Sequence, residues 1–393
     1  MLRKGFSSGT AVTAAAVGAL RVLVQGGGVG SFPVAVFLPC GIYFPVSVTP
    51  AHLDLSLGLA VAEVKKDGGD DPDVTHGAIF SVELKLFPRR TNSAGVYLKA
   101  GSGVGVVTRD GLPVRIGEPA VNPVPRQMLR DNIESFFLGL DAARLGMLAD
   151  LSGKNGEVFE NGVFIPFSRL SFLPFSLSVT VSVPGGEVLA RRTLNPRLGI
   201  EGGLSILGTT GLVIPYSHEA YRETIEASLK FARTNGLDVT VLSTGGKSEK
   251  FARKHLPELP DAAFVQIADF YQFSLKKAEE LGFSGVIHSV FFGKLMKMAM
   301  GFGYTHAHFS SLDFDEFLRK FGRRLAEPLA CQIASANTAR QVLDILKENG
   351  RKDIIEWIAH RALEHSRAFA PKIKSLGLIL FDYDGSVLLR RVE

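Results

Sequence analysis

Residues 65–77 form an acidic, glycine-punctuated stretch that holds the densest group of side chains able to do chemistry. It carries four aspartates and one histidine, among them Asp71, Asp73 and His76. Such a group can ligate a metal, bind hydroxyl groups or face a cation, although Asp, Gly and Pro also build ordinary solvated turns. Crowded carboxylates repel one another unless a positive or hydrogen-bonding group lies nearby, which favours a functional loop. The spacing of a calcium loop is absent, so we predict no metal site.

Residues 195–211 form a second unusual stretch, with five glycines, two threonines and an arginine that follows a proline. A predicted hairpin over residues 177–183 and 187–193 leads into it. Glycine alone tolerates positive φ and removes its side chain from a contact surface, so the stretch predicts tight turns and close approach to another group. A strand between two loops is the ordinary alternative.

A glycine pair at Gly245 and Gly246 follows a predicted strand over residues 239–243. Asp269 ends the next predicted strand, 24 residues after Gly245. A doubly wound fold places an acid on a ribose hydroxyl at a spacing of about 20 residues. The pairing therefore indicates nucleoside binding at the carboxyl ends of two strands.

Three further motifs have simpler explanations. Residues 246–248 resemble the end of a phosphate-binding loop, but its first glycine would fall at Val241, so the phosphate cradle is incomplete. Residues 378–386 imitate the aspartyl nucleophile motif of haloacid-dehalogenase phosphatases. No helix and further sheet follow them, so a hairpin with an Asp-Gly turn is the better interpretation. His306 and His308 have no third ligand nearby in sequence, and we interpret them as core or surface histidines.

The elements that position these residues begin with mixed α and β structure. Residues 10–24 predict a buried, Ala-rich helix that Thr10 can cap and glycines 26–28 stop. The N–H groups at its start suit an anion, whereas an ordinary capped helix is the simpler interpretation. Arg126 ends an extended, proline-rich run over residues 122–126 and begins the next helix on a stiff support.

The second half of the chain alternates strands and helices. Such βαβ units build a parallel sheet that binds ligands at the carboxyl ends of its strands. Residues 313–369 have helical spacing, with Trp357 in their core. The predicted strands cover residues 239–243, 264–268 and 286–290, and the predicted helices cover 247–254, 270–281 and 293–300.

We therefore predict a protein of α/β and α+β class in three parts. A mixed α+β domain with the substrate-binding loops covers residues 1–200, and a Rossmann-like parallel α/β domain covers residues 201–310. A helical cover and a terminal β-hairpin cover residues 311–393.

Composition limits the classes of function. The 393 residues are 46% hydrophobic and 21% charged, with a formal net charge of +5. Because Lys and Arg are scattered without interleaved aromatic runs, an anionic small substrate explains this charge and we predict no nucleic-acid partner. Cys40 and Cys331 allow neither a disulfide framework nor a CxxC metal site.

The N-terminus imitates a signal peptide over residues 11–24, but Arg21 interrupts the apolar run. No apolar run reaches the ~20 residues that cross a bilayer. We expect a soluble, cytoplasmic protein without a membrane partner. Whether it forms a homo-oligomer stays open.

In series, five motifs resemble the CbiD family, the cobalt-precorrin-5B C1-methyltransferases of anaerobic cobalamin biosynthesis. They occur in family order at residues 2–10, 66–77, 122–126, 193–211 and 293–297. The resemblance implies transfer of a methyl group from S-adenosylmethionine to ring carbon C1 of a cobalt-bound corrin precursor, which gives cobalt-precorrin-6A. Cobalt then enters only as part of the substrate.

A corrin precursor carries many acetate and propionate groups, so such a site needs cations on firm backbone. The donor is a cation with ribose hydroxyls, so it needs carboxylate or carbonyl partners. Asp71 and Asp73 can face either ligand. The expected substrate contacts are Arg3, Asp71, Arg126, Arg197, Thr209, Thr210 and Lys294, and the expected donor contacts are Gly202, Gly203, Gly245, Gly246 and Asp269.

For the reaction, an electron-rich carbon attacks the sulfonium methyl group in line, so positioning supplies most of the acceleration and no side-chain nucleophile is needed. Asp73 and His76 are the candidates if a base removes a proton. We expect the site in a cleft between the two halves, with Arg197, Thr209 and Thr210 at its floor and the glycines of residues 195–211 against a large flat ligand.

Three positions depart from the family pattern. Ala11 replaces a usual Cys, residues 244–246 read Thr-Gly-Gly in place of Pro-Gly-Asn, and Phe291 replaces a His. These changes keep open a non-catalytic protein that binds a corrinoid or another tetrapyrrole. A nucleotide-dependent enzyme and a phosphatase complete the alternatives.

Overall fold

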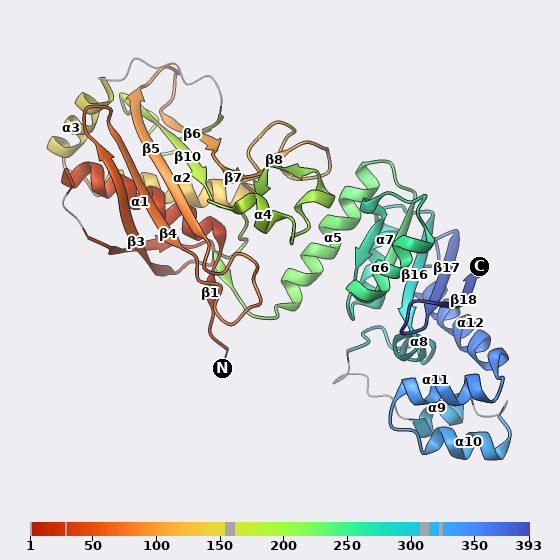
Figure 1. Cartoon of the computed structure of the whole chain (residues 1–393). Helices are drawn as coiled ribbons and strands as arrows, with labels where there is room; N and C mark the ends of the chain where they lie inside the picture. Colours follow the sequence, from red (N-terminus) through yellow and green to blue (C-terminus); the bar gives the residue numbers. More distant parts are fainter. Residues whose placement is uncertain (1, 28–29, 154–161, 307–313, 322–324) are drawn as a thin grey trace. The chain divides into compact units, whose positions relative to one another are not determined.

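The computed structural model of the chain forms two compact units, Met1–Ser217 and His218–Glu393. The described residues are 2–27, 30–153, 162–306, 314–321 and 325–393. Each unit is described by itself (Figure 1). The mixed α and β character predicted from the sequence is confirmed, while the predicted division into three parts stays a prediction.

A seven-stranded sheet forms the body of the first unit. Neighbouring strands run antiparallel except for β10 and β6, which are parallel. Buried and exposed or half-buried residues alternate along β2 and β4, because successive side chains point to opposite faces of a strand. In sheet order the strands are β2 (Phe32–Phe37), β3 (Tyr43–Asp54), β4 (Leu59–Lys65), β5 (Ile79–Pro88), β10 (Phe175–Ser182), β6 (Gly95–Ala100) and β9 (Val163–Pro166).

Helix α1 (Ser8–Gln25) packs against β3, β4 and β5 of this sheet. Its alanines are fully buried, and their small side chains let the helix lie close to the strands. It is long and apolar enough to cross a membrane, but 72% of its residues are buried inside the structure, as in a core helix. The cap is Ser7 rather than the predicted Thr10, because the Ser7 hydroxyl accepts the Thr10 N–H at 3.2 Å.

This unit contains two further helices of more than ten residues, α2 (Pro123–Leu138) and α3 (Ala142–Gly153). The predicted hairpin over residues 177–183 and 187–193 is wrong, because α4 (Gly186–Ala190) follows β10. Strand β10 already pairs with β5 on one side and β6 on the other, so no edge is left for a hairpin partner.

Short strand pairs fix the glycine-rich stretch of residues 195–211 and the segment after it. It contains the 3-10 helix η1 (Asn195–Leu198). Three strands then pair with distant parts of the chain, so the stretch ties earlier loops together. The pairs are β11 (Ile200–Glu201) with β8 (Val106–Val107), β12 (Gly203–Leu204) with β7 (Gly103–Val104), and β13 (Leu212–Val213) with β1 (Gly5–Phe6).

The second unit is built on a five-stranded sheet in which four strands are parallel. The predicted order of strands and helices over residues 239–300 is confirmed. In sheet order the strands are β15 (Phe264–Gln266), β14 (Val239–Ser243), β16 (Gly285–Phe291), β17 (Ser375–Phe381) and β18 (Val387–Val392), and the helices of this part are α5 (His218–Thr234), α6 (Gly246–His255), α7 (Tyr271–Glu280) and α8 (Phe292–Ala299).

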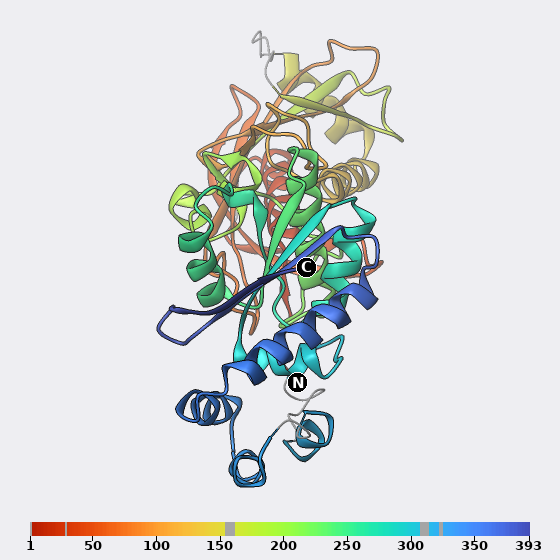
Figure 2. The ribbon, with the colours of Figure 1, turned by 90° about the vertical axis from the view of Figure 1, so that its right-hand side faces the viewer.

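The predicted terminal hairpin is confirmed by β17 and β18, the dark blue antiparallel pair in Figure 2. Four helices precede it, and α12 packs against α8 and β17. Trp357 is half-buried at the edge of the core instead of at its centre. The four helices are α9 (Phe314–Phe321), α10 (Glu327–Ala334), α11 (Ala339–Glu348) and α12 (Lys352–Phe369).

Candidate functional site

The acidic loop of the first unit holds the N-terminal segment of the chain. The Arg3 guanidinium forms an ion pair with Asp67, and the Arg3 N–H donates to Asp70 Oδ2 at 2.6 Å. Asp71 Oδ1 accepts the N–H of Tyr216 at 3.1 Å. Each of these three carboxylates therefore binds a cation or a backbone N–H group, which offsets the repulsion between neighbouring negative charges.

Asp73 lies inside the loop and is paired with Lys66, whose side chain is only 3% exposed. The Thr75 N–H and hydroxyl also donate to Asp73 Oδ1, at 2.8 and 2.6 Å. Burial alone would raise the pKa of Asp73, but the Lys66 charge and the hydrogen bonds outweigh it, and the pKa lies below its ordinary value. A carboxylate held in this way is a weak proton acceptor.

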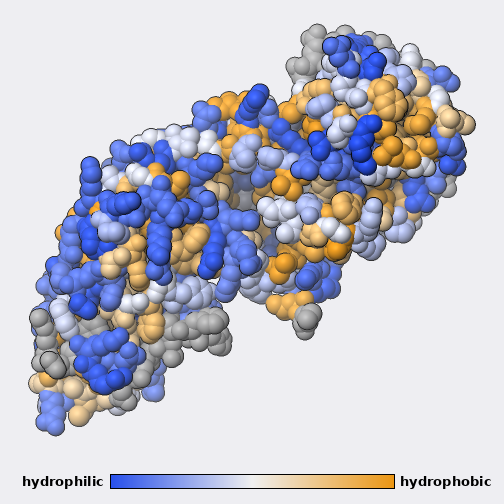
Figure 3. All heavy atoms as spheres, turned by 180° about the vertical axis from the view of Figure 1, so that it is seen from behind, coloured by the Kyte–Doolittle hydropathy of each residue, from blue (hydrophilic) through white to orange (hydrophobic). Residues whose placement is uncertain are grey.

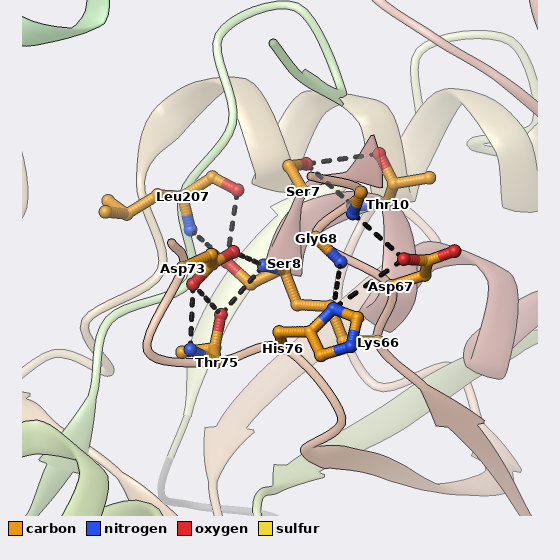
Figure 4. A network of polar contacts seen from close by, with 11 residues as sticks. Ser7, Ser8, Thr10, Lys66, Asp67, Gly68, Asp73, Thr75, His76 and Leu207 are labelled. Atoms are coloured by element: carbon orange, nitrogen blue, oxygen red, sulfur yellow. Dashed lines mark hydrogen bonds and ion pairs between the residues drawn. The ribbon is translucent and has the colours of Figure 1, made fainter. Parts of the chain in front are cut away.

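His76 is half-exposed at the rim of the same loop. Its Nδ1 accepts the N–H of Gly68 at 3.0 Å, as Figure 4 shows. Because Nδ1 is an acceptor, the neutral ring carries its proton on Nε2. His76 therefore offers an N–H donor to a ligand at its free edge.

The polar groups at the N-terminus of α1 form hydrogen bonds with residues 207 and 211 of the same chain. The Gly9 N–H donates to the Leu207 carbonyl at 2.9 Å, and the Ser8 hydroxyl accepts the Leu207 N–H at 2.8 Å. The Thr10 hydroxyl donates to the Gly211 carbonyl at 2.7 Å. This end is an ordinary capped helix, which was the simpler of the two interpretations (Figure 4).

The glycines of residues 195–211 mainly approach protein atoms, contrary to the expectation of a flat ligand. A Cβ added to Gly203 would lie 2.2 Å from the Gly103 carbonyl carbon, and one on Gly208 would lie 2.2 Å from the Ser7 hydroxyl. Gly199 and Gly211 likewise lie against protein side chains. At Gly202 (φ 82°) an added Cβ would meet no atom within 4 Å, so this glycine borders open space.

The other predicted substrate contacts of this unit differ in their protein contacts and in their exposure to solvent. Arg126 uses its guanidinium on the preceding loop, with Nε 2.7 Å from the Val121 carbonyl oxygen and Nη1 2.8 Å from Glu118. It therefore fixes that loop. Arg197 is half-buried in η1, while Thr209 and Thr210 are exposed.

In the second unit, the predicted nucleoside residues meet at one edge of the parallel sheet. Gly245 and Gly246 follow β14, and an added Cβ on Gly245 would meet no atom within 4 Å. The nearest atom to a Cβ on Gly246 is the Gln266 amide nitrogen, 3.7 Å away at the end of the adjacent strand β15. Asp269 lies three residues beyond Gln266.

Asp269 and Lys294, predicted for different ligands, form an ion pair. The Thr305 hydroxyl also donates to Asp269 Oδ1 at 3.1 Å, and the Thr305 N–H donates to the Asp269 carbonyl at 3.0 Å. Ala268 has a φ of 45°, a left-handed conformation uncommon outside glycine, and it turns the chain immediately before Asp269. The Asp269 carboxylate is thus held in one place in the loop that follows β15.

An aromatic group beside Asp269 escaped prediction from the sequence. Phe270 follows Asp269, stacks on Tyr221 at 5.6 Å and lies 5.2 Å from the Tyr304 ring. Burial, and then the charge of Asp269, raise the pKa of both tyrosines. The sequence feature that could have predicted this group is the position of Phe270 directly after Asp269, the acidic residue at the end of a predicted strand. These rings make one wall at the sheet edge apolar.

Among the described residues, no group of three His, Cys, Asp or Glu side chains is arranged to hold a metal ion. Cys40 and Cys331 are both free and exposed. His306 stacks on Tyr304 at 5.9 Å, while His308 lies outside the described residues.

The comparisons with known proteins agree along most of the chain. The family model described as CbiD matches residues 1–158 and 164–215, and the one described as CbiD, C-terminal domain, matches residues 304–392. A curated protein of Nitratidesulfovibrio vulgaris named cobalt-precorrin-5B C(1)-methyltransferase is 38% identical over 98% of this chain and 92% of its own length.

Two further relatives carry the same name. The protein of Geobacillus kaustophilus is 38% identical over 91% of this chain and 86% of its own length. That of Leptospira borgpetersenii is 35% identical over 98% of this chain and 94% of its own. A crystal structure of a cobalamin biosynthesis protein (cbiD) from Archaeoglobus fulgidus is 27% identical and covers 82% of this chain and 85% of that one, with a TM-score of 0.37.

Proposed function

The chain belongs to the CbiD family, and on that premise we propose that it transfers a methyl group to ring carbon C1 of cobalt-precorrin-5B, with S-adenosylmethionine as the donor. The observation that carries this proposal is the 38% identity to a protein of that name along 98% of the chain. Cobalt enters as part of the substrate. A cytoplasmic location and association into a homo-oligomer stay predictions.

We assign the donor to the carboxyl edge of the parallel sheet, treating the second unit as a Rossmann-like domain. Support comes from the open space at Gly245 and from Asp269, which lies three residues beyond the end of the adjacent strand β15. Asp269 Oδ1 is occupied by Lys294 and Thr305, whereas Oδ2 has no hydrogen bond to the described residues. Oδ2 is therefore the oxygen we assign to a ribose hydroxyl.

We assign the corrin precursor to the first unit. Its acetate and propionate groups call for cations, and we assign this role to Arg197 and to Arg3, which would have to exchange its ion pair with Asp67 for the substrate, with Thr209 and Thr210 as hydroxyl contacts. Its ring needs apolar surface. In the described part of this unit fourteen large hydrophobic side chains are exposed, and Ile214 is one of them. Figure 3 shows hydrophobic residues, coloured orange, at the surface of the molecule. The cleft expected between the two units stays a prediction.

Bound S-adenosylmethionine supplies an electrophilic methyl group, and the protein supplies position. Orientation of two reactants is worth ~7 to 11 kcal/mol, so a side-chain nucleophile is not required. We propose that Asp73 orders its loop through Lys66 and Thr75, because that carboxylate is already neutralised. His76 presents Nε2–H to the substrate and acts as a hydrogen-bond donor.

Titration calorimetry of the full chain with S-adenosylmethionine and with S-adenosylhomocysteine tests the donor. Both should bind, and anaerobic incubation with cobalt-precorrin-5B should add one methyl group to the corrin by mass spectrometry. A folded chain that binds neither compound would sink the proposal. Binding of the corrin without donor binding would instead identify a non-catalytic corrinoid-binding protein.

A further inference from the structure

A cavity of about 220 Å³ lies beside Asp269 in the second unit. One wall begins at Phe270, the residue after Asp269, and another includes Tyr304, the residue before the Thr305 that binds Asp269. The backbone N–H of Gln272 donates to the Gly303 carbonyl at 2.9 Å and joins the two walls. The lining residues are Arg222, Phe270, Gln272, Phe273, Lys276, Gly303 and Tyr304.

Two cations of this cavity have no carboxylate partner among the described residues. The guanidinium carbon of Arg222 lies 5.3 Å from the Phe270 ring centroid and 5.4 Å from that of Phe273. Cation–π contacts with two rings hold the guanidinium in place, and its N–H groups have no carboxylate partner in the described part of the chain. Lys276 lies on α7, where its side chain is exposed, and it adds a second positive charge.

The larger cavity of the second unit, about 510 Å³, lacks this property. Its cations already have acidic partners, because Arg361 pairs with Glu364 and Lys320 pairs with Glu316. His360 Nδ1 lies 2.7 Å from the Glu393 carboxylate. An incoming anion would have to break these contacts. In the smaller cavity, no carboxylate of the described chain pairs with Arg222 or Lys276.

We propose that Arg222 and Lys276 bind a carboxylate group of one of the two substrates of the proposed methyl transfer. The inference rests on that function. A guanidinium donates two parallel hydrogen bonds to a carboxylate, and the rings of Phe270, Phe273 and Tyr304 can cover the carbon atoms attached to it. The position next to Asp269, the proposed ribose contact, favours the methionine carboxylate of the donor over an acetate or propionate of the corrin.

Two nucleoside probes separate these sources. S-adenosylhomocysteine carries the amino-acid carboxylate, whereas 5′-methylthioadenosine has the same nucleoside without it. Arg222→Gln and Lys276→Gln should each raise the Kd of S-adenosylhomocysteine about 10- to 100-fold and leave that of methylthioadenosine within about twofold. Arg222→Lys, which keeps the charge without the planar fork, should give an intermediate Kd.

The corrin source gives a different result. If the cavity holds a corrin carboxylate, the same variants raise KM for cobalt-precorrin-5B and leave both nucleoside affinities unchanged. Lys230→Gln, an exposed cation on the same helix as Arg222, is the matched control and should change nothing.

Unchanged affinities for every ligand in variants with wild-type thermal unfolding would overturn the carboxylate site. That result differs from failure of the proposed function, in which the wild-type chain itself binds neither nucleoside and transfers no methyl group. Lys276 is exposed, so its variant keeps the test decisive should Arg222→Gln fold poorly.

Discussion

Lys294, in the first turn of α8, and Asp269, in the loop that follows β15, form an ion pair across 25 residues of sequence. Their side chains are 28% and 19% exposed. The Lys294 ammonium also donates to the Thr305 carbonyl at 3.2 Å. The pair ties together two elements at the sheet edge where we place the donor, so Lys294 acts on the donor site through Asp269.

Asp269→Ala should therefore weaken S-adenosylhomocysteine binding about 10- to 100-fold, because it removes the proposed ribose acceptor. Lys294→Met should weaken the same ligand less and lower the free energy of unfolding by about 1–3 kcal/mol, since it leaves a half-buried carboxylate unpaired. Calorimetry and urea unfolding measure the two effects. If Lys294→Met keeps wild-type stability and changes only KM for the corrin, which rises, Lys294 would instead be a substrate contact.

Asp73→Asn separates a structural carboxylate from a catalytic base. Lys66 is almost fully buried, so loss of its counter-charge should cost about 3–5 kcal/mol at pH 7. The pKa of Asp73 is lowered in the folded state, so its contribution is present above its unfolded pKa and is lost as pH falls through the folded pKa. Urea unfolding of wild type and variant should therefore converge in acid. A variant of normal stability without methyl transfer would restore Asp73 as a base.

His76→Asn tests whether the Nε2–H group of His76 contacts the substrate. The Asn oxygen can replace Nδ1 as the acceptor for the Gly68 N–H, but it brings no donor to the position of Nε2. We expect His76→Asn to unfold within about 1 kcal/mol of wild type and to lose about 10- to 100-fold in kcat. Retention of full activity in His76→Asn would show that the Nε2–H group does not contact the reacting substrate.

Gly203 and Gly202 distinguish backbone packing from ligand contact. Gly203→Ala would place a Cβ 2.2 Å from the Gly103 backbone, so the β12 and β7 pair must separate and thermal stability should fall steeply. Gly202→Ala meets no atom and should cost only the left-handed backbone term of about 1–2 kcal/mol. A folded Gly202→Ala chain with weakened ligand binding would keep this glycine in the site. Equal stability losses would contradict the packing explanation.

Local patterns predicted elements well and distant partners poorly. The strand at Val239–Ser243 was predicted with its observed bounds, because alternation with helices and flanking glycines are local signals. The hairpin after β10 failed, since the strands that occupy both edges of β10 lie far away in sequence. For the same reason, the sequence did not predict the contact of Gly203 with Gly103 or the place of Arg222 in the cavity beside Phe270.

His288 gives a pH test of the core of the second unit. It is fully buried, its Nε2 lies 3.0 Å from the Ser366 hydroxyl, and its Nδ1 has no hydrogen-bond partner among the residues that the structure describes. Burial lowers the pKa of His288 to about 3, so between pH 6.5 and 3 the unfolded chain binds one proton more than the folded chain. Stability should then fall by up to about 1.4 kcal/mol per pH unit on acidification from this group.

His288→Leu should remove that slope from urea unfolding measured between pH 4 and pH 6. At pH 7 the lost bond to Ser366 and the relief of the unpaired Nδ1 act in opposite directions, so the change there should stay within about 2 kcal/mol. His255→Leu, at an exposed position of the same unit, is the control and should keep the wild-type slope. An unchanged slope in His288→Leu would mean that the imidazole takes up its proton in the folded chain, and the core around Ser366 would then have to open to water.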